Sequence, residues 1–487
     1  MSNNDACGVG APRTGKATIK HKGGFNAAVI VGLVALLSAA VLAYDADYLY
    51  MLVYVWFGVV YGLFLQYGRF CMASAVRDLF AVGVPRMAVG VMIAVVLYAL
   101  TSAAVTMGGF STFSAHPLGW HILIGGTIFG FGIIFTGGCA SSSLYKSGEG
   151  NVGSMLVLVA ISFSQAIFVS SEWFSQFVPA SWTESALDKG MPEELDVTST
   201  WFDQFMTGYI WDLSGGTVAD MMGQSDTFVG IFIGNALLGA ILPTALILVF
   251  LYAIAFRKGY MRREKIENPG LSDHMRGMWT MFTSSKNTAI AGLGIGIFAG
   301  LQMWVTSALR QKYDILNFGE MLERKGFYDQ VSLQGTVFDP GYWYITTQEA
   351  QWGGWVLDKL GVSNMESNIF FGLENGIPNP LLNAPGMMSI GIILGAAVIA
   401  NVNREFKWKL PSMETAIFAL IGGTLMGIGA RVGMGCNVGA FFAAVTNGDL
   451  TGWIFLAGMA LGGFFGVRAL TRWMEWRASR NDDEFAL

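Results

Sequence analysis

The chain has 487 residues, of which 53% are hydrophobic and only 13% are charged. Soluble domains carry about 25% charged residues, so this composition excludes a water-soluble globular protein. The formal net charge of -5 gives no support to nucleic-acid binding. The cysteines are too few and too scattered for a disulfide framework or a CxxC metal site, and they are Cys7, Cys71, Cys139 and Cys436.

The apolar residues form runs of roughly 18 residues or more, the length that an α-helix needs to cross a bilayer. In chain order these runs predict about ten spanning helices, near 26–44, 50–67, 86–107, 119–135, 152–170, 228–256, 288–308, 386–402, 413–430 and 450–469. Basic residues precede the first run, but it is long enough to span and no convincing cleavage site follows it. We therefore expect an all-α integral membrane protein that retains its first helix.

Basic residues are concentrated in five segments, namely the N-terminal tail, Arg77–Arg86, the 257–286 loop, Arg404–Lys409 and the C-terminal tail. With ten spans, all of these segments fall on one side, and basic loops stay in the cytoplasm. This pattern predicts a multi-pass protein of the cell inner (plasma) membrane with cytoplasmic N- and C-termini. The same count puts polar insertions 171–227 and 310–385 outside. The first insertion is acidic, and we assign it no binding role.

An internal repeat is the most specific pattern in the sequence. Gly125–Gly132, followed by Gly138-Cys139, matches Gly422–Gly429, followed by Gly435-Cys436, and every matched position is displaced by the same 297 residues (125 to 422, 139 to 436). A constant displacement without gaps indicates a duplication. On the predicted topology the two copies cross the membrane in opposite directions. Such inverted repeats are typical of transporters.

The predicted organisation follows from the spans and the repeat. It comprises a cytoplasmic tail (1–25), membrane repeat 1 (26–170), an acidic extracytoplasmic insertion (171–227), a linking helix with a basic cytoplasmic loop (228–287), membrane repeat 2 (288–469, containing the insertion 310–385) and a cytoplasmic tail (470–487). A weaker match joins Ser74–Arg77 to Ser307–Arg310. In this alignment Trp304 and Val305 occupy the place of Cys71.

Glycines in the repeat have two predicted roles. The four-residue spacing of Gly126 with Gly130, and of Gly423 with Gly427, is typical of closely packed membrane helices. In contrast, Gly137-Gly138-Cys139 and Gly433 to Cys436 indicate broken or re-entrant helices, whose unwound backbone lines a cavity. In inverted-repeat transporters such breaks offer free helix N-termini to the substrate near the bilayer midplane.

Three cysteines, Cys71, Cys139 and Cys436, each follow an apolar helix within a run of small residues. A lone membrane cysteine is usually just a small hydrophobic residue, but three at such breaks favour a function. A thiol is a weak donor and a polarisable partner for a soft sulfur atom, and helix N-terminal amides bind anions. The sequence therefore predicts a site for thiosulfate-like anions.

Other residues near the breaks join the predicted substrate pathway. Gly138 and Gly435 belong to the breaks themselves, and Asn437 either donates a hydrogen bond to the anion or caps the next helix. Arg69 and Arg431 either attract the anion or extend to the membrane interface.

The remaining polar residues near the breaks receive no chemical role. Arg77 and Lys146 fit an interfacial position, and Glu149 and Asn151 fit an ordinary turn and cap. No P-loop, nucleophile elbow, paired carboxylates or histidine cluster is present in the sequence. We therefore expect no catalytic residue, metal or cofactor.

Three motifs resemble one known family. GRFCMASAVRD (Gly68–Asp78), FGFGIIFTGGCASSSLYKSGEGN (Phe129–Asn151) and GIGARVGMGCNVGAFFAAVTNGDLTGW (Gly427–Trp453) are similar to the YeeE/YedE family, associated with uptake of sulfur compounds, thiosulfate above all, and in some members with selenium. The resemblance covers the membrane core. It implies an hourglass-shaped inverted repeat in which three cysteines, here Cys71, Cys139 and Cys436, pass thiosulfate along by S–H contacts. The outer insertions exceed the minimal family pattern.

We therefore expect a non-enzymatic transporter that imports thiosulfate or a related anion through a cysteine-lined pathway between inverted repeats. The alternatives are a membrane sulfurtransferase that passes sulfane sulfur to a cytoplasmic carrier, a selenium-compound transporter, or an accessory membrane subunit. A cytoplasmic sulfur-carrier protein is a candidate partner in addition to the anion and the bilayer. On the predicted orientation Cys436 meets the anion first.

Overall fold

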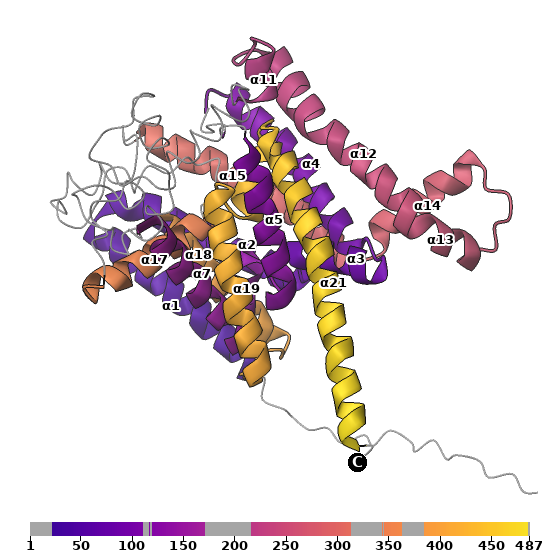
Figure 1. The fold of residues 1–487 in the computed structure, drawn as a ribbon. Helices are drawn as coiled ribbons and strands as arrows, with labels where there is room; N and C mark the ends of the chain where they lie inside the picture. Colours follow the sequence, from indigo (N-terminus) through magenta and orange to yellow (C-terminus); the bar gives the residue numbers. More distant parts are fainter. Residues whose placement is uncertain are drawn as a thin grey trace, which may run out of the picture.

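The computed structural model describes residues 22–110, 116, 119–170, 216–312, 343, 345–362 and 384–485 (Figure 1). Within these ranges the chain is almost entirely helical, and its β-structure is limited to isolated bridges. The predicted all-α class is therefore confirmed. The N-terminal tail with Cys7 and most of the two predicted insertions lie outside the described residues.

Long apolar helices make up the body of the molecule. In the described part of the chain, 9 helical stretches are long and apolar enough to cross a membrane. A further predicted span is α7 (Val152–Ser170), whose described apolar part is shorter. The other long elements are α1 (Lys22–Tyr44), α2 (Leu49–Gly68), α4 (Arg86–Met107), α5 (Trp120–Thr136), the continuous stretch η2 (Val229–Ile241), α12 (Leu242–Leu251), η3 (Tyr252–Phe256) and α13 (Arg257–Arg263), then α15 (Lys286–Lys312), α18 (Ala384–Val402), α19 (Met413–Val432) and α21 (Thr451–Phe485). The chain is a multi-pass membrane protein.

Short helices follow three of the long ones after a break. They are α3 (Met72–Val82) after α2, α6 (Ala140–Gly148) after α5, and η7 (Asn437–Ala443), continued by α20 (Ala444–Thr446), after α19. A further short helix, α17 (Ile345–Lys359), precedes α18, and η1 (Ala46–Tyr48), α11 (Val218–Met221) and α14 (Leu271–Thr283) complete the set. The breaks predicted before Cys139 and Cys436 are confirmed.

Glycines allow the long helices to pack closely, with α2 along α18, α15 along α4, α5 along α21 and α19 along α7. A Cβ atom on Gly126 would lie 2.6 Å from the Phe455 carbonyl oxygen of α21, and one on Gly423 would lie 2.7 Å from Ala160 Cβ of α7. Gly130 and Gly427 make equivalent approaches one turn further on. Their predicted packing role is confirmed.

The region of Trp304, which the weaker match aligns with the region of Cys71, does not share the break found at Cys71. Cys71 lies at a break between two helices, whereas Trp304 and Val305 lie inside the unbroken helix α15. The indole of Trp304 is 47% exposed on the outside of the helix bundle. A short Ser-Ala-x-Arg string inside two apolar helices does not require the two to have the same backbone path.

Helix ends next to the basic segments lie on one face of the described part of the molecule. Helix α1 begins beside the α18–α19 loop, where Asn26 Nδ2 donates to Asn401 Oδ1 at 3.3 Å. The C-terminal part of α21 joins the start of α19 through the ion pair of Arg477 with Glu414. The start of α15 contacts the end of α2, because Thr288 Oγ1 donates to the Gly68 carbonyl. We call this surface the basic face.

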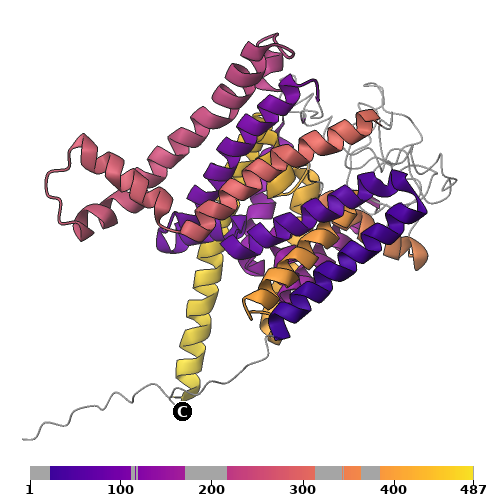
Figure 2. The same cartoon turned by 180° about the vertical axis from the view of Figure 1, so that it is seen from behind.

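The helix ends that do not lie on the basic face lie on the opposite face of the molecule. The loop before α21 forms a bridge between Thr217 and Asp449, and Asp449 also accepts a hydrogen bond from the His116 amide at 2.9 Å. Gln311 at the end of α15 donates to the Gly109 carbonyl beyond the end of α4. Figure 2 shows α1 at the periphery, alongside α18, and α12 to α14 projecting from the body. Helix α21 runs past its predicted end at residue 469 (Figure 1).

Candidate functional site

Each of the three predicted pathway cysteines is the residue immediately before a short helix. Cys71 caps the N-terminus of α3, Cys139 that of α6 and Cys436 that of η7, each in an extended backbone conformation. All three are free thiols and are at most 2% exposed. The breaks that sequence analysis inferred from small residues therefore bring each thiol to a helix N-terminus.

The same backbone turn precedes each cysteine. The residue two positions earlier is left-handed in all three breaks, with φ of 51° at Arg69, 64° at Gly137 and 59° at Met434. Only glycine adopts this conformation readily, so Arg69 and Met434 hold strained backbone. Strain of this kind concentrates at functional sites, where the surrounding packing maintains it.

The short helices point their N-termini toward the middle of the molecule. Helix α6 runs from Cys139 toward the basic face, where it ends next to Glu149 and the Arg69 guanidinium. Helix α20 ends at the opposite face, near Asp449. The amide ends of these helices carry partial positive charge. An anion in the middle is therefore attracted from both sides.

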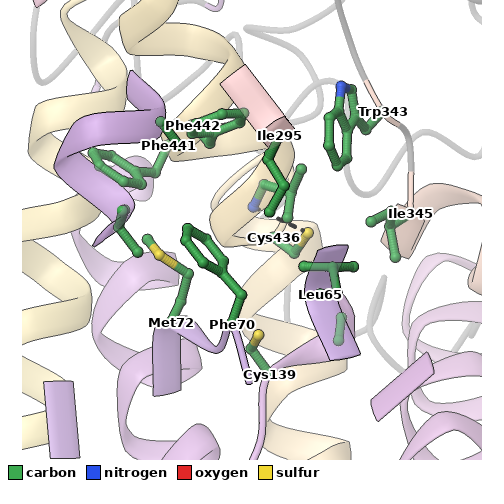
Figure 3. Close-up of a cluster of buried hydrophobic side chains, with 14 of the residues drawn as sticks. Leu65, Phe70, Met72, Cys139, Ile295, Trp343, Ile345, Cys436, Phe441 and Phe442 are labelled. Atoms are coloured by element: carbon green, nitrogen blue, oxygen red, sulfur yellow. Dashed lines mark hydrogen bonds between the residues drawn. The ribbon is translucent and has the colours of Figure 1, made fainter. Parts of the chain in front are cut away.

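Helix α17 adds a further N-terminus that sequence analysis missed. It begins at Ile345, close to Cys436 in Figure 3, and Trp343 just before it stacks on Tyr61 with ring centroids 4.1 Å apart. Sequence analysis assigned this segment to an extracytoplasmic insertion. Its apolar residues are interrupted by Gln348, Glu349 and Gln351, so no window of the sequence there reads as a membrane helix.

The three thiols form two groups with different neighbours, and these groups are the two halves of the site. Cys71 lies next to Cys139, and Cys139 Sγ lies 3.3 Å from Ser141 Oγ. Cys436 stands apart from this pair, and its sulfur accepts a hydrogen bond from the Val438 amide at 3.4 Å. The Cys139 break is further fixed by Lys146, whose Nζ donates to the Gly137 carbonyl at 2.7 Å.

A small cavity lies between the Cys71–Cys139 pair and Cys436. It has a volume of about 30 Å³ and is bordered by Phe70, Met72, Ser141, Trp343, Asn437 and Phe442. Figure 3 shows Leu65 and Phe70 at the level between Cys139 and Cys436. A cavity needs about 10–15 Å³ on this measure to hold one water, so the cavity is too small for a five-atom anion. Apolar side chains, among them Leu65, Phe70 and Phe442, form a constriction there in this conformation.

Asn437 provides the clearest sign of a ligand in this cavity. Its side chain is fully buried, and neither its Nδ2 nor its Oδ1 has a hydrogen-bond partner within the described residues. A buried amide without partners costs about 1–3 kcal/mol. An anion beside Cys436 would accept hydrogen bonds from Asn437 Nδ2 and would offset that cost.

Among the basic residues of the predicted pathway, Arg69 lies at the basic face and is engaged in ion pairs. Its guanidinium lies 2.8 Å from Glu405 and 3.4 Å from Glu149, and Lys409 also pairs with Glu149 at 3.2 Å. Glu149 lies in the turn that ends α6, as predicted, but it is only 3% exposed. It is the buried centre of an ion-pair network, a role that only long-range contacts reveal. We call these four residues the ion-pair ring.

The other predicted residues occupy different positions. Gly138 lies in the Cys139 break, where a Cβ would stand 2.7 Å from Ser142 Oγ, and Gly435, with φ of 153°, lies in the Cys436 break. Arg431 is half-buried in the last turn of α19. Arg77 pairs with its neighbour Asp78 at 2.9 Å.

The sequence was compared with known proteins. The family described as "Sulphur transport" matches residues 67–465. The chain is 23% identical over 407 residues to the thiosulfate transporter TsuA of Escherichia coli (strain K12), covering 83% of this chain and 90% of that protein. It is 26% identical over 414 residues to the thiosulfate transporter TsuA of Spirochaeta thermophila (strain ATCC 700085 / DSM 6578 / Z-1203), covering 82% and 92%. The probable transporter YedE of Escherichia coli (strain K12) is 34% identical over 128 residues, 26% of this chain and 32% of that protein.

Proposed function

We propose, from the premise that this chain belongs to the sulphur transport family, that it imports thiosulfate or a closely related sulfur anion across the membrane. One observation carries the proposal: three buried thiols cap helix N-termini on the two sides of one small central cavity. The two relatives named thiosulfate transporter match over most of their length. They support thiosulfate as the first substrate to test.

The site suits thiosulfate because it combines hard and soft partners. Free amides at a helix N-terminus stabilise oxyanion oxygens, and the Asn437 amide supplies a further donor. The Cys436 thiol is polarisable and donates weakly, which suits the terminal sulfur. No covalent bond has to form for the anion to pass, so an enzymatic step is not part of the proposal.

The pathway is proposed to run between inverted repeats from Cys436 to the Cys139–Cys71 pair. The pairing of α2 with α18, and of α15 with α4, supports the repeat, because each partner of one pair corresponds in chain order to a partner of the other. The gathering of basic segments on one face supports a cytoplasmic location for that face and for both termini in the inner membrane. Cys436 then meets the anion first.

Passage requires the constriction to open. Phe70 directly precedes Cys71 and borders the cavity together with Met72, so a rotation of the α2–α3 break moves the side chain of Phe70 and the thiol together. Beyond the thiol pair, the exit runs past the ion-pair ring. A separate cytoplasmic sulfur carrier is a proposed acceptor at that exit.

The membrane potential opposes the import of an anion. Moving one charge against 100 mV costs about 2.3 kcal/mol, so a dianion entering a negative interior opposes about 4.6 kcal/mol per 100 mV. Passive entry is unfavourable unless the anion is consumed or its charge is compensated.

The test is uptake of radiolabelled thiosulfate into vesicles that contain the purified full chain. We expect saturable uptake that falls at least tenfold when Cys71, Cys139 and Cys436 are all replaced by serine, and no change in the matched variant Cys7→Ser. Equal uptake by the triple variant and the wild type would contradict a cysteine-lined pathway. Competition by sulfite, polysulfide or selenium oxyanions ranks the alternative substrates.

A further inference from the structure

A carboxyl group lies buried beside the proposed binding site without a partner. Glu349 on α17 is 0% exposed, and neither of its carboxyl oxygens has a hydrogen-bond partner among the described residues. Its neighbour Gln348 is equally buried and its side-chain amide is also without a partner there. Neither residue is explained by the packing of a structural helix, because unsatisfied buried polar groups destabilise a fold.

The position of Glu349 relates it to the anion site. Its charge would act on the Cys436 thiol, and Thr346, one turn earlier on α17, lies near the same thiol. Helix α17 starts at the middle of the molecule, next to Trp343, which borders the central cavity. Glu349 therefore lies on the side of the cavity that the anion reaches first in the proposed pathway.

No described cation neutralises Glu349. Helices α7 and α18, against which α17 packs, contain no titratable residue, and the α6 cation Lys146 is bonded to the Gly137 carbonyl. Helix α19 contributes Glu414, paired with Arg477 at the basic face, and Arg431, which has interactions of its own. Burial alone acts on the carboxyl group. An isolated charge in such surroundings is strongly disfavoured, so the neutral, protonated form is the stable one.

We propose that Glu349 is a proton-binding site that couples import of the anion to entry of a proton; this inference rests on the proposed transport function. A dianion beside Cys436 repels a carboxylate at Glu349, so the anion binds with the protonated form. By linkage, protonation of Glu349 raises the affinity for the anion by the same factor. The proton enters a carboxyl oxygen from the outside and returns to water on the inside, which lowers the charge carried from -2 to -1.

The test measures anion accumulation in vesicles containing the full chain, with the membrane potential held at zero by valinomycin and equal potassium. A gradient of one pH unit, acid outside, is imposed, and radiolabelled thiosulfate is the probe. One proton per anion gives about tenfold accumulation inside, because one pH unit is a factor of ten in proton activity. A pH dye inside the vesicles should report proton entry triggered by thiosulfate and not by sulfate.

Three variants distinguish proton coupling from transport of the anion itself. Glu349→Gln keeps the neutral shape of the protonated side chain, so we expect thiosulfate exchange between the two sides to continue, while accumulation above equilibrium and triggered proton entry are lost. Glu349→Asp keeps an acid and should retain accumulation. Asp358→Asn removes a carboxyl group from the same helix, where it pairs with Lys359 at 3.2 Å, and should behave as the wild type.

Two results would overturn proton coupling through Glu349. Accumulation that persists in Glu349→Gln overturns the proposal, and so does a wild-type protein that equilibrates thiosulfate but never accumulates it under the pH gradient. The second result does not require any variant to fold, and it leaves the transport function intact. A wild-type protein that moves no thiosulfate under any condition contradicts the transport function itself.

Discussion

The two halves of the central site differ in how completely their polar groups are satisfied. On the side of the basic face, Cys71 lies next to Cys139, Lys146 donates to the Gly137 carbonyl, and Arg69 pairs with Glu149 in the ion-pair ring. On the other side, Cys436 has one amide donor, and Asn437 and Glu349 have no partners among the described residues. The half around Cys436 therefore has polar groups available to a ligand, whereas the half toward the basic face is held together by its own contacts.

The largest effect is expected from backbone changes at the two breaks. Gly435 has φ of 153°, which only glycine adopts, and a Cβ there would lie 3.0 Å from the Ala440 amide nitrogen; Gly137 has φ of 64° and open space around it. We expect Gly435→Ala to cost on the order of 1–3 kcal/mol and to abolish uptake. Gly137→Ala should retain most uptake, as measured by thermal unfolding and vesicle transport. An equal loss of stability and uptake in Gly435→Ala and Gly137→Ala would contradict the predicted difference between the two breaks.

A smaller, kinetic difference is expected between single cysteine variants. Cys436→Ser removes the first soft partner of the anion, so it should raise the KM for thiosulfate by about tenfold, the value of one hydrogen bond of ~1.4 kcal/mol. Cys139→Ser acts after binding and should lower the maximal rate with a smaller change in KM. Initial-rate uptake across a range of thiosulfate concentrations measures both. A raised KM for Cys139→Ser together with a lowered maximal rate for Cys436→Ser would mean that the anion meets Cys139 before Cys436.

Asn437→Ala is expected to separate binding from stability. The amide has no partner within the described residues, so its removal should leave thermal stability unchanged or slightly raised. The same change should weaken thiosulfate binding by at least tenfold, because a hydrogen bond to a charged group contributes about 1.5–3 kcal/mol. Ligand-induced thermal shift reads both quantities in one experiment. A loss of stability without a change in binding would make Asn437 a structural residue.

The smallest effect is expected in the ion-pair ring. Glu149→Gln removes the charge that Arg69 and Lys409 share, and both partners are about half exposed to solvent. Partly exposed ion pairs contribute up to about 1 kcal/mol each, so we expect the midpoint of thermal unfolding to fall by a few degrees while KM is unchanged. A large increase in KM would make the ring part of the binding site.

Sequence patterns predicted the apolar helices, the two glycine–cysteine breaks and the cysteines, because each of these is local. Runs of apolar residues measure span length, and small residues mark where a helix breaks. The interactions of Glu149, Glu349 and Trp343 were missed, because they join segments far apart in the sequence, such as Arg69 and Glu149, which are 80 residues apart. Helix α17 was missed since its buried face carries polar side chains, which in a sequence are indistinguishable from those of an external loop.

The faint match that set Trp304 opposite Cys71 illustrates the same limit. Four residues of similar type recur by chance in apolar helices, whereas the match around Gly125 and Gly422 extends through the following cysteine without a gap. The longer match includes a break that is present after both α5 and α19, whereas the shorter one aligns the break at Cys71 with the unbroken helix α15. A repeat is a useful guide to a site only where it includes the turn that forms the site.

The central claim is that the anion crosses intact through the cysteine-lined passage. Thiosulfate labelled with different isotopes on its two sulfur atoms tests this claim directly in vesicles containing the full chain. Our account predicts that both labels reach the interior at equal rates and are recovered there as thiosulfate. Entry of the terminal sulfur alone, with the sulfonate sulfur left outside as sulfite, would contradict transport and indicate a membrane sulfurtransferase.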